Sequence, residues 1–413
     1  MFDLRDHKST CNDANGWLNC FSIAKSLPAI NMTVNKINNM KIAVLGAGMV
    51  GRTIAADLSK NYEVTSFDIS EANLELLKTT SPVHTQRADL ANLSGYTSLL
   101  EGYPLVVSAV PGFMGYQTLQ TLIELKKNVV DISFFPEDAL QLADLARQNG
   151  VTAIVDCGVA PGMSNLILGR YNEAMQVQSF ECMVGGLPKV RTKPFEYKAP
   201  FSPIDVIEEY SRPARYQQNG HIVTRPALSD AELVNFEKIG TLESFNTDGL
   251  RSILYTMPHI PDMKEKTLRY PGHITLIEAL QLAGFFSEQP IECNGISMRP
   301  IDFTSRILFD QWKLQPGEAE FTVMKIIIKG INEGKPQTIE YFLYDEYNEE
   351  TKTSSMSRTT AYTCTAAVNL LTKGLFVEKG VFPPELVGKH KNCFDFVLNY
   401  LAERSVIYTK NVY

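Results

Sequence analysis

The chain has 413 residues, which is more than one small hydrophobic core supports, so we expect two domains or one domain with a large insertion. Its net charge of −7 argues against nucleic acid or an anionic membrane as the main partner, because either would favour a basic surface. The seven cysteines are odd in number and never spaced as C-x-x-C, which predicts a reducing, cytoplasmic compartment and no structural metal site.

The first segment, residues 1–39, carries acidic residues where a signal peptide carries a basic stretch, and it has no adequate apolar core. We therefore expect residues 1–39 to form a disordered extension, with Met40 as the functional start.

Residues 40–161 alternate short apolar runs with segments whose apolar residues recur every three to four positions. This alternation predicts βαβ units and a doubly wound parallel sheet of the Rossmann type, in an α/β domain. The expected strands are 41–45, 63–67, 105–110, 128–133 and 151–156.

The pattern changes after residue 162. The runs "EFTVMKIIIKG" and "QTIEYFLYDEY" flank the polar turn "INEGKP", which predicts a β-hairpin. We expect residues 162–354 to form an inserted α+β domain with a mostly antiparallel sheet. Residues 355–413 return to helical patterns, and we expect them to pack on the first domain.

Three glycines, Gly46, Gly48 and Gly51, follow the first predicted strand and open a helix, which is the context that a G-x-G-x-x-G motif requires. Gly46 permits the tight turn, Gly48 lets the backbone approach a pyrophosphate, and Gly51 lets the helix lie close to the sheet. The N–H groups at the start of the helix, around Met49 and Val50, then face the phosphates.

Asp68 ends the second predicted strand, where a carboxylate accepts hydrogen bonds from both ribose hydroxyls of a dinucleotide. The same charge repels a 2′-phosphate, and no arginine follows it in "DISEAN", so NAD is favoured over NADP. Asp89 follows the third strand and is either a contact near the adenine or a helix cap.

Further candidates lie at the ends of later strands. Val110 and Pro111, in "SAVPG", either leave room for the nicotinamide ribose or simply end a strand. Asp131 and Cys157 follow on the same rim, where ligands of doubly wound sheets bind. Cys157 is either part of the site or a small buried filler.

The inserted domain carries two polar clusters around glycines, "ESFNTDGLRS" and "TLRYPGH". Arg251 or Arg269 could hold a substrate carboxylate through two hydrogen bonds, or each could be an ordinary ion pair. His273 could titrate near neutrality or only begin a helix. The substrate-binding candidates are Asn246, Asp248, Arg251, Arg269 and Tyr270.

Taken together, "GAGMVG", "SAVPG", "DCGVAPGMSN", "FNTDGLR", "LRYPGH" and "TTAY…KGVFPPE" resemble the saccharopine dehydrogenase family, especially a bacterial branch similar to lysine 6-dehydrogenase. The resemblance implies a Rossmann domain with an inserted α+β domain that also dimerises, and a homodimer that oxidises amines of amino acids with a pyridine nucleotide. It puts "GAGMVG", Asp68 and "SAVPG" at the cofactor, and Asp131, Cys157 and "FNTDGLR" near the nicotinamide and the substrate.

The favoured function is that of an NAD-dependent oxidoreductase acting on the C–N bond of an amino-acid amine, with oxidative deamination to the semialdehyde, as in lysine 6-dehydrogenase, as the expected reaction. Asp131 is the expected proton acceptor, with His273 as the alternate. The alternatives are a saccharopine or carboxynorspermidine dehydrogenase or reductase, and a non-catalytic NAD sensor.

Overall fold

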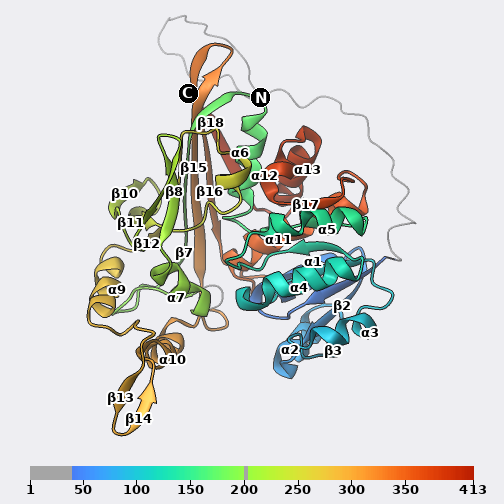
Figure 1. Cartoon of the computed structure of the whole chain (residues 1–413), viewed down its shortest axis with the longest axis horizontal. Helices are drawn as coiled ribbons and strands as arrows, with labels where there is room; N and C mark the ends of the chain where they lie inside the picture. The colour runs from blue at the N-terminus through green and yellow to red at the C-terminus, as the bar shows by residue number, and fades with distance from the viewer. Residues whose placement is uncertain (1–39, 200–202) are drawn as a thin grey trace, which may run out of the picture. The chain divides into compact units, whose positions relative to one another are not determined.

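The computed structural model describes residues 40–199 and 203–413, which form a seven-stranded sheet, a nine-stranded sheet and a two-stranded hairpin (Figure 1). Residues 1–39, for which we expect a disordered extension, lie outside the described residues. No helix of the described ranges is long and apolar enough to cross a membrane.

The first sheet is parallel throughout, with the strand order β17-β6-β5-β4-β1-β2-β3. Its strands are β1 (Lys41–Leu45), β2 (Glu63–Asp68), β3 (His84–Arg87), β4 (Leu105–Ser108), β5 (Asn128–Asp131), β6 (Thr152–Ile154) and β17 (Gly380–Phe382). The predicted doubly wound sheet is thus confirmed. Because the strand order reverses at β1, a crevice is expected beside the carboxyl ends of β1 and β4.

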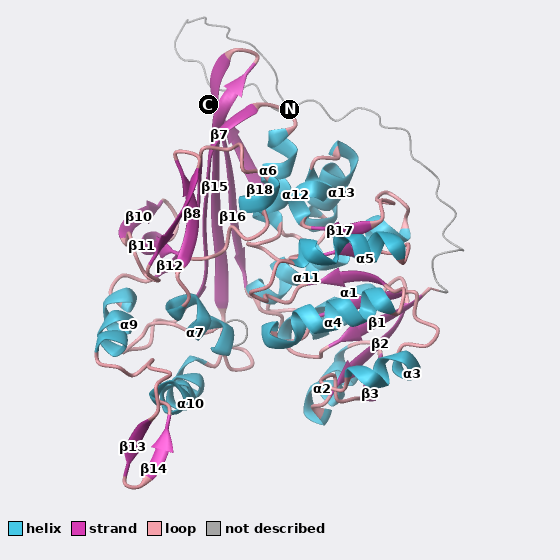
Figure 2. Cartoon of the chain, in the orientation of Figure 1, coloured by secondary structure: helices cyan, strands magenta, loops and turns pink. Residues whose placement is uncertain are grey.

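Helices cover both faces of this sheet (Figure 2). The side chains of β1 alternate between two buried clusters, since successive residues of a strand point to opposite faces. Ile42 and Val44 belong to the cluster that includes α1 and α11, and Ala43 and Leu45 to the cluster that includes α4. The helices are α1 (Met49–Leu58), α2 (Glu71–Thr80), α3 (Tyr96–Leu99), α4 (Gly112–Glu124), α5 (Ala143–Gln148) and α6 (Met163–Asn172).

The second sheet has the order β10-β11-β12-β7-β15-β16-β18, with β8 and β9 attached at β12. Its strands are β7 (Gln176–Pro188), β8 (Ala214–Gln218), β9 (His221–Arg225), β10 (Glu232–Phe236), β11 (Gly240–Asn246), β12 (Asp262–Arg269), β15 (Glu320–Asn332), β16 (Lys335–Glu346) and β18 (Tyr408–Val412). All its pairings are antiparallel except that of β7 with β12, as expected for a mostly antiparallel sheet.

The predicted late hairpin is the pair β15 and β16, in register from Phe321 opposite Glu346 to Asn332 opposite Lys335. Glu333 and Gly334 form its turn, and both have positive φ, which is the backbone that a two-residue hairpin requires. The remaining helices of this part are α7 (Pro203–Ser211), α8 (Ile253–Thr256), α9 (His273–Leu282) and α10 (Pro300–Trp312), and β13 (Ile291–Cys293) pairs with β14 (Ile296–Met298).

The last segment contains α11 (Ser355–Thr372), α12 (Pro384–Gly388) and α13 (Lys391–Ala402) and contributes to both sheets. β17 pairs with β6 of the first sheet, in line with the expected return of the chain. β18 departs from that expectation, because it pairs with β16 of the second sheet.

A buried carboxylate anchors this segment to α1. Asp57 accepts hydrogen bonds from Thr365 Oγ1 at 2.8 Å, Tyr400 OH at 2.8 Å and Arg404 Nε at 2.9 Å. Burial alone would raise the pKa of Asp57, but Arg404 and the hydroxyl groups hold it below its ordinary value.

Candidate active site

The glycine-rich loop between β1 and α1 lies against the end of β4. Gly46 has a φ of +103°, and a Cβ atom there would lie 2.4 Å from the carbonyl oxygen of Ala109. A Cβ atom at Gly51 would lie 2.1 Å from the carbonyl oxygen of Gly46. Neighbouring backbone therefore excludes a side chain at both positions, as the roles of the first and third glycines require.

Gly48 differs from the other two glycines, because a Cβ atom there would meet no heavy atom within 4 Å. It immediately precedes α1 and lines a large cleft together with Met49 and Val50. An open backbone at a helix N-terminus binds phosphate well, since it offers free N–H groups and the positive end of the helix dipole. The residues of this loop thus fit the pyrophosphate of a dinucleotide.

Asp68, at the end of β2, also lines the cleft. Its Oδ2 accepts a hydrogen bond from the backbone N–H of Ala47 at 2.6 Å, and its Oδ1 accepts one from Ser70 at 2.7 Å. These bonds fix the carboxylate beside the glycine-rich loop, and each oxygen keeps a lone pair for a ribose hydroxyl.

Two arginines that the sequence analysis missed lie near Asp68. Arg52 lines the cleft and donates from Nη1 to the carbonyl oxygen of Ala47 at 2.8 Å. Burial lowers the pKa of Arg52, and the charge of Asp68 opposes this effect. Arg87 is opposite Asp68 in the pairing of β2 with β3 and is exposed. Arg52 lies in α1, before Asp68 in the chain. The prediction of NAD considered only the residues that follow Asp68 directly.

Asp89 is exposed at the rim of the cleft, and its Oδ1 accepts a hydrogen bond from the backbone N–H of Ala91 at 3.0 Å. Val110 and Pro111, after β4, line the cleft as well. The cleft therefore brings together the residues that the sequence analysis assigned to the cofactor, which are Gly46, Gly48, Met49, Val50, Gly51, Asp68, Asp89, Val110 and Pro111.

The cleft has a volume of about 2040 Å³ and extends from the glycine-rich loop to the second sheet. Sites for small ligands usually measure about 300 to 1,000 Å³, so the cleft can hold a dinucleotide and a second molecule. The charged groups that line it on the side of the second sheet include Glu208, Glu209, Arg212, Asp248, Glu265 and Arg269.

Strand β12 supplies a row of polar side chains to this lining. Glu265, Thr267 and Arg269 all line the cleft, because alternate residues of a strand share one face. The sequence analysis found Arg269 and missed the other two. The alternating pattern E-x-T-x-R in "EKTLR" was the available signal.

Asp131 is completely buried and does not line the cleft. Its Oδ1 accepts a hydrogen bond from Ser133 Oγ at 2.6 Å, and its Oδ2 has no partner among the described residues. Burial raises the pKa of Asp131 to about 7. Ser133 and Phe134, which follow β5, reach the cleft instead, so a direct role of Asp131 in proton transfer stays a prediction.

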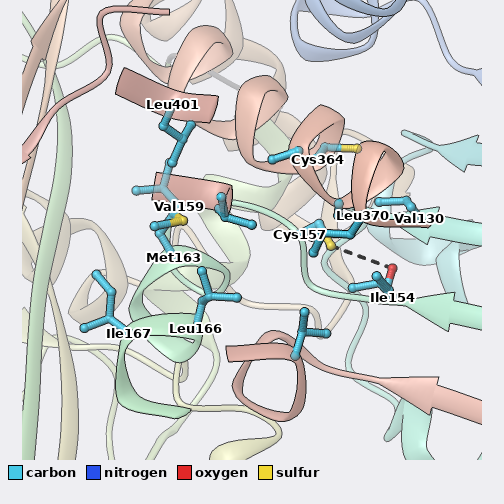
Figure 3. Close-up of a cluster of buried hydrophobic side chains, with 14 of the residues drawn as sticks. Val130, Ile154, Cys157, Val159, Met163, Leu166, Ile167, Cys364, Leu370 and Leu401 are labelled. Carbon is cyan, nitrogen blue, oxygen red and sulfur yellow. Dashed lines mark hydrogen bonds between the residues drawn. The ribbon is translucent and has the colours of Figure 1, made fainter. Parts of the chain in front are cut away.

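Cys157 is a core residue, and Figure 3 shows its side chain among Val130, Ile154, Leu370 and Cys364. Within the described ranges, the only polar contacts of its thiol are weak ones from Sγ to the carbonyl oxygens of Ile154 and Val155, at 3.8 and 3.7 Å. Burial raises the pKa of this thiol well above its ordinary value, so it remains protonated. The position fits the buried filler that the sequence left open as an alternative.

Arg251 does not line the cleft, because it is bound to the end of the first sheet. Its Nη2 lies 3.0 Å from Asp156 Oδ1, its Nε donates to Asp156 Oδ2 at 3.2 Å, and its Nη1 donates to the carbonyl oxygen of Phe135. Both charged side chains are buried, and both residues have positive φ, at +49° and +53°. The expected free guanidinium for a substrate carboxylate is thus already paired.

Arg269 lines the cleft but is also paired, with Glu209 Oε2 at 3.0 Å. Its Nε donates to the hydroxyl of Tyr210 at 2.9 Å, and this hydroxyl lies 2.9 Å from His273 Nε2. Because His273 Nδ1 contacts the carbonyl oxygen of Phe195 at 2.9 Å, Nδ1 donates and Nε2 accepts. Burial and the charge of Arg269 lower the pKa of His273 to about 3, so the imidazole is neutral. His273 does not line the cleft.

Of the other substrate-binding candidates in the second domain, one lines the cleft and two do not. Asp248 lines the cleft and accepts two hydrogen bonds at 2.8 Å from the guanidinium of Arg215. Asn246 lies elsewhere and donates to Asp230 Oδ2 at 2.7 Å. Tyr270 donates to the carbonyl oxygen of Pro188 at 2.9 Å. Neither Asn246 nor Tyr270 lines the cleft, because neighbouring residues of a strand point to opposite faces.

The pairing of Arg251 predicts the effect of removing it. Arg251→Ala should lower the free energy of unfolding by about 3 to 5 kcal/mol, because Asp156 is left buried without its partner. Denaturant unfolding measures this change. Arg306→Ala is the control, since its ion pair with Asp310 is exposed and should contribute at most about 1 kcal/mol. Unchanged stability together with a raised KM for the substrate would favour carboxylate binding by Arg251 instead.

Comparison with known proteins identifies the chain's relatives. It is 25% identical over 286 residues to alpha-aminoadipic semialdehyde synthase of Arabidopsis thaliana, a match that covers 60% of this chain and 27% of that protein. It is 21% identical over 376 residues to carboxyaminopropylagmatine dehydrogenase of Synechocystis sp., a match that covers 84% of this chain and 92% of that protein. The chain spans less than a third of the length of the curated semialdehyde synthases that it matches.

The ligand-free saccharopine dehydrogenase (L-Glu forming) of Saccharomyces cerevisiae has a similar fold. The TM-score is 0.74 at 18% identity, over 91% of this chain and 100% of that chain. Residues 42–154 match the family domain described as "Saccharopine dehydrogenase NADP binding domain". Residues 158–407 match the one described as "Saccharopine dehydrogenase C-terminal domain". The chain therefore belongs to the saccharopine dehydrogenase family.

Proposed function

We propose that the protein is a pyridine-nucleotide-dependent oxidoreductase that acts on the C–N bond of an amino-acid amine. The observation that carries the proposal is the continuity of the cleft, which joins the open backbone at Gly48 to the polar face of β12. A dinucleotide at the loop and an amine at β12 would share one cavity. Relatives that are named as dehydrogenases support the same class of reaction.

A bound nicotinamide would supply one chemistry, the exchange of a hydride with the carbon that carries the nitrogen. The side chains must supply the proton transfer. An alkyl ammonium, with a reference pKa of about 10.4, has no lone pair to help the hydride leave, so a basic group must take its proton. Asp131 and His273 do not line the cleft, so we assign this role to a carboxylate that does.

The specific reaction that the motif "FNTDGLR" favours is oxidative deamination of lysine to the semialdehyde, as in lysine 6-dehydrogenase. The alternative is a saccharopine or carboxynorspermidine dehydrogenase or reductase, whose substrates are secondary amines. The volume of the cleft, about 2040 Å³, supports this alternative, because a secondary amine that joins two amino-acid parts needs more room than lysine.

A turnover assay tests the proposed function. The purified chain is mixed with NAD or NADP and with lysine, saccharopine or carboxynorspermidine, and the absorbance of the reduced nicotinamide is followed. We expect turnover with at least one amine. Turnover of lysine alone supports deamination, and turnover of a secondary amine alone supports the alternative. If no combination of nucleotide and amine gives turnover, the proposed enzymatic function is contradicted and a non-catalytic nucleotide sensor remains.

We propose NAD as the cofactor, because the carboxylate of Asp68 is positioned beside the loop that fits the phosphates. Its charge favours ribose hydroxyls and repels a 2′-phosphate. Arg52 and Arg87 lie on the same side and would favour NADP, the nucleotide in the name of the matching family domain. Asp68 contacts the same loop residue, Ala47, as Arg52 does and is opposite Arg87, so it is the residue to test.

Asp68→Asn should raise the KM for NAD by about tenfold and lower the KM for NADP, because it removes a charged acceptor and its repulsion of phosphate. Steady-state kinetics with both nucleotides measures the effect. Glu71→Gln is the matched control, since Glu71 is an exposed acid nearby that does not line the cleft. Equal KM values for NAD in wild type and Asp68→Asn would show that Asp68 does not bind the ribose hydroxyls of NAD.

The proposed partner is a second copy of the chain. Figure 1 shows where α9, the β13–β14 hairpin and α10 lie in the fold. Large apolar side chains are exposed on these elements and just after α9, and we call this surface the apolar arm. Its members are Leu276, Leu282, Phe285, Ile291, Ile296, Phe303 and Ile307. A two-stranded hairpin is barely stable in isolation, and a large exposed apolar surface marks an interface.

Phe303→Asp should convert the dimer to a monomer, because it would bury a charge in the apolar arm. Sedimentation velocity measures the mass of the assembly. Val190→Asp places the same charge at another exposed apolar position and should leave the dimer intact. A wild-type chain that sediments as a monomer would contradict the proposal.

A further inference from the structure

Four acidic side chains that line the cleft lie near one another. Asp156, Glu209 and Asp248 all lie close enough to Glu265 to disfavour its ionisation. Three of the four have an arginine of their own. The pairs are Asp156 with Arg251 at 3.0 Å, Glu209 with Arg269 at 3.0 Å and Asp248 with Arg215 at 2.8 Å.

Glu265 is the exception among the described residues. Its side chain accepts no hydrogen bond and forms no ion pair there, although only 5% of the residue is exposed. It faces the cleft and packs against Gly249, where a Cβ atom would lie 1.9 Å from Glu265 Oε2. A carboxyl group at a cleft wall that no protein group pairs with leaves its lone pairs to whatever fills the cleft, so it is complementary to a ligand that brings a positive charge.

Other buried carboxylates show what a purely structural role looks like in this protein. Glu320 accepts a hydrogen bond from the backbone N–H of Met356 at 3.1 Å. Glu385 accepts hydrogen bonds from Thr256 Oγ1 at 2.7 Å and Asn165 Nδ2 at 3.3 Å. Both are held by the fold, whereas the carboxylate of Glu265 faces the space that a ligand would fill.

We infer that Glu265 binds the cationic nitrogen of the substrate and accepts its proton, and that the ligand is an amine that is protonated in water. The inference rests on the proposed function and deepens it. In the transfer, an N–H bond of the ammonium group breaks and an O–H bond forms on a Glu265 oxygen. The electron pair of the broken bond stays on the nitrogen as its lone pair.

The electrostatic surroundings of Glu265 suit this role. The groups that face it are Glu209 of α7, Cys182 of β7, Asp156 after β6, and Asp248 and Arg251 after β11. Burial first, and then Glu209 and Asp248, raise the pKa of Glu265 to about 8. The pKa of Glu265 is thus closer to the pKa of an ammonium group than the pKa of an ordinary carboxyl group is. The smaller difference makes the proton transfer less unfavourable.

The raised pKa also fixes the direction of the pH dependence. Without ligand, Glu265 is protonated below pH about 8 and must lose that proton before it pairs with a cation. The affinity for an ammonium ligand should therefore increase as the pH rises toward 8. The affinity should not follow this trend when position 265 is glutamine.

Calorimetric titration of the full-length chain with lysine, saccharopine and carboxynorspermidine tests the inference. Wild type should bind at least one of them about 30-fold or more tightly than Glu265→Gln, the factor expected when a buried charge pair loses one partner. Glu181→Gln is the matched control. Glu181 lies on the neighbouring strand β7, forms an ion pair at 3.2 Å with Lys264 of β12 and does not line the cleft. This variant should bind as wild type does.

Nucleotide titration of Glu265→Gln verifies its fold, since the glycine-rich loop is unchanged. Equal amine affinity in wild type and Glu265→Gln, or no binding of any of the three amines to wild type, would overturn the inference. Turnover in wild type with an unaltered rate and pH profile in Glu265→Gln would overturn the inference and keep the proposed function. Binding of an amine that depends on Glu265, without turnover, would support the inference and overturn the function.

Discussion

The buried ion pair between Asp156 and Arg251 is the contact on which the cleft depends. Asp156 follows β6 of the first sheet, and Arg251 follows β11 of the second, 95 positions later in the chain. Arg251 also donates to the carbonyl oxygen of Phe135, so one side chain from the second domain binds two segments at the edge of the first. Separation would leave two buried charges without partners, which is why this contact resists opening.

The last segment of the chain reinforces the same arrangement. α11 packs on α1, where Asp57 accepts hydrogen bonds from Thr365, Tyr400 and Arg404. β17 then joins the first sheet and β18 the second, so both sheets contain strands from this segment. One continuous buried cluster includes residues of both domains as a result. The glycine-rich loop and the face of β12 are thereby fixed on opposite sides of one cavity.

Four neighbouring carboxyl groups in the cleft follow a simple electrostatic rule with one exception. Arginines neutralise Asp156, Glu209 and Asp248 within the fold, whereas Glu265 has no ion pair among the described residues and its carboxyl group faces the cavity. The arginines that a sequence reader would assign to a substrate carboxylate are therefore occupied by acids of the protein itself. The open position belongs to an acid, which is complementary to the positive charge of an amine.

Local patterns by themselves determined the parallel type of the first sheet and five of its seven strands, the β15–β16 hairpin, the three glycines and the position of Asp68. These features depend on the period of apolar residues and on backbone conformation over a few neighbours, so nearby residues suffice to predict them. Tertiary structure alone decided that Arg251 meets Asp156, that Arg52 lies beside Asp68, that His273 is buried and neutral, and that Glu265 has no partner within the described part of the chain. Such pairings join residues far apart in the chain, and their charges depend on burial, which arises only when the two sheets pack together.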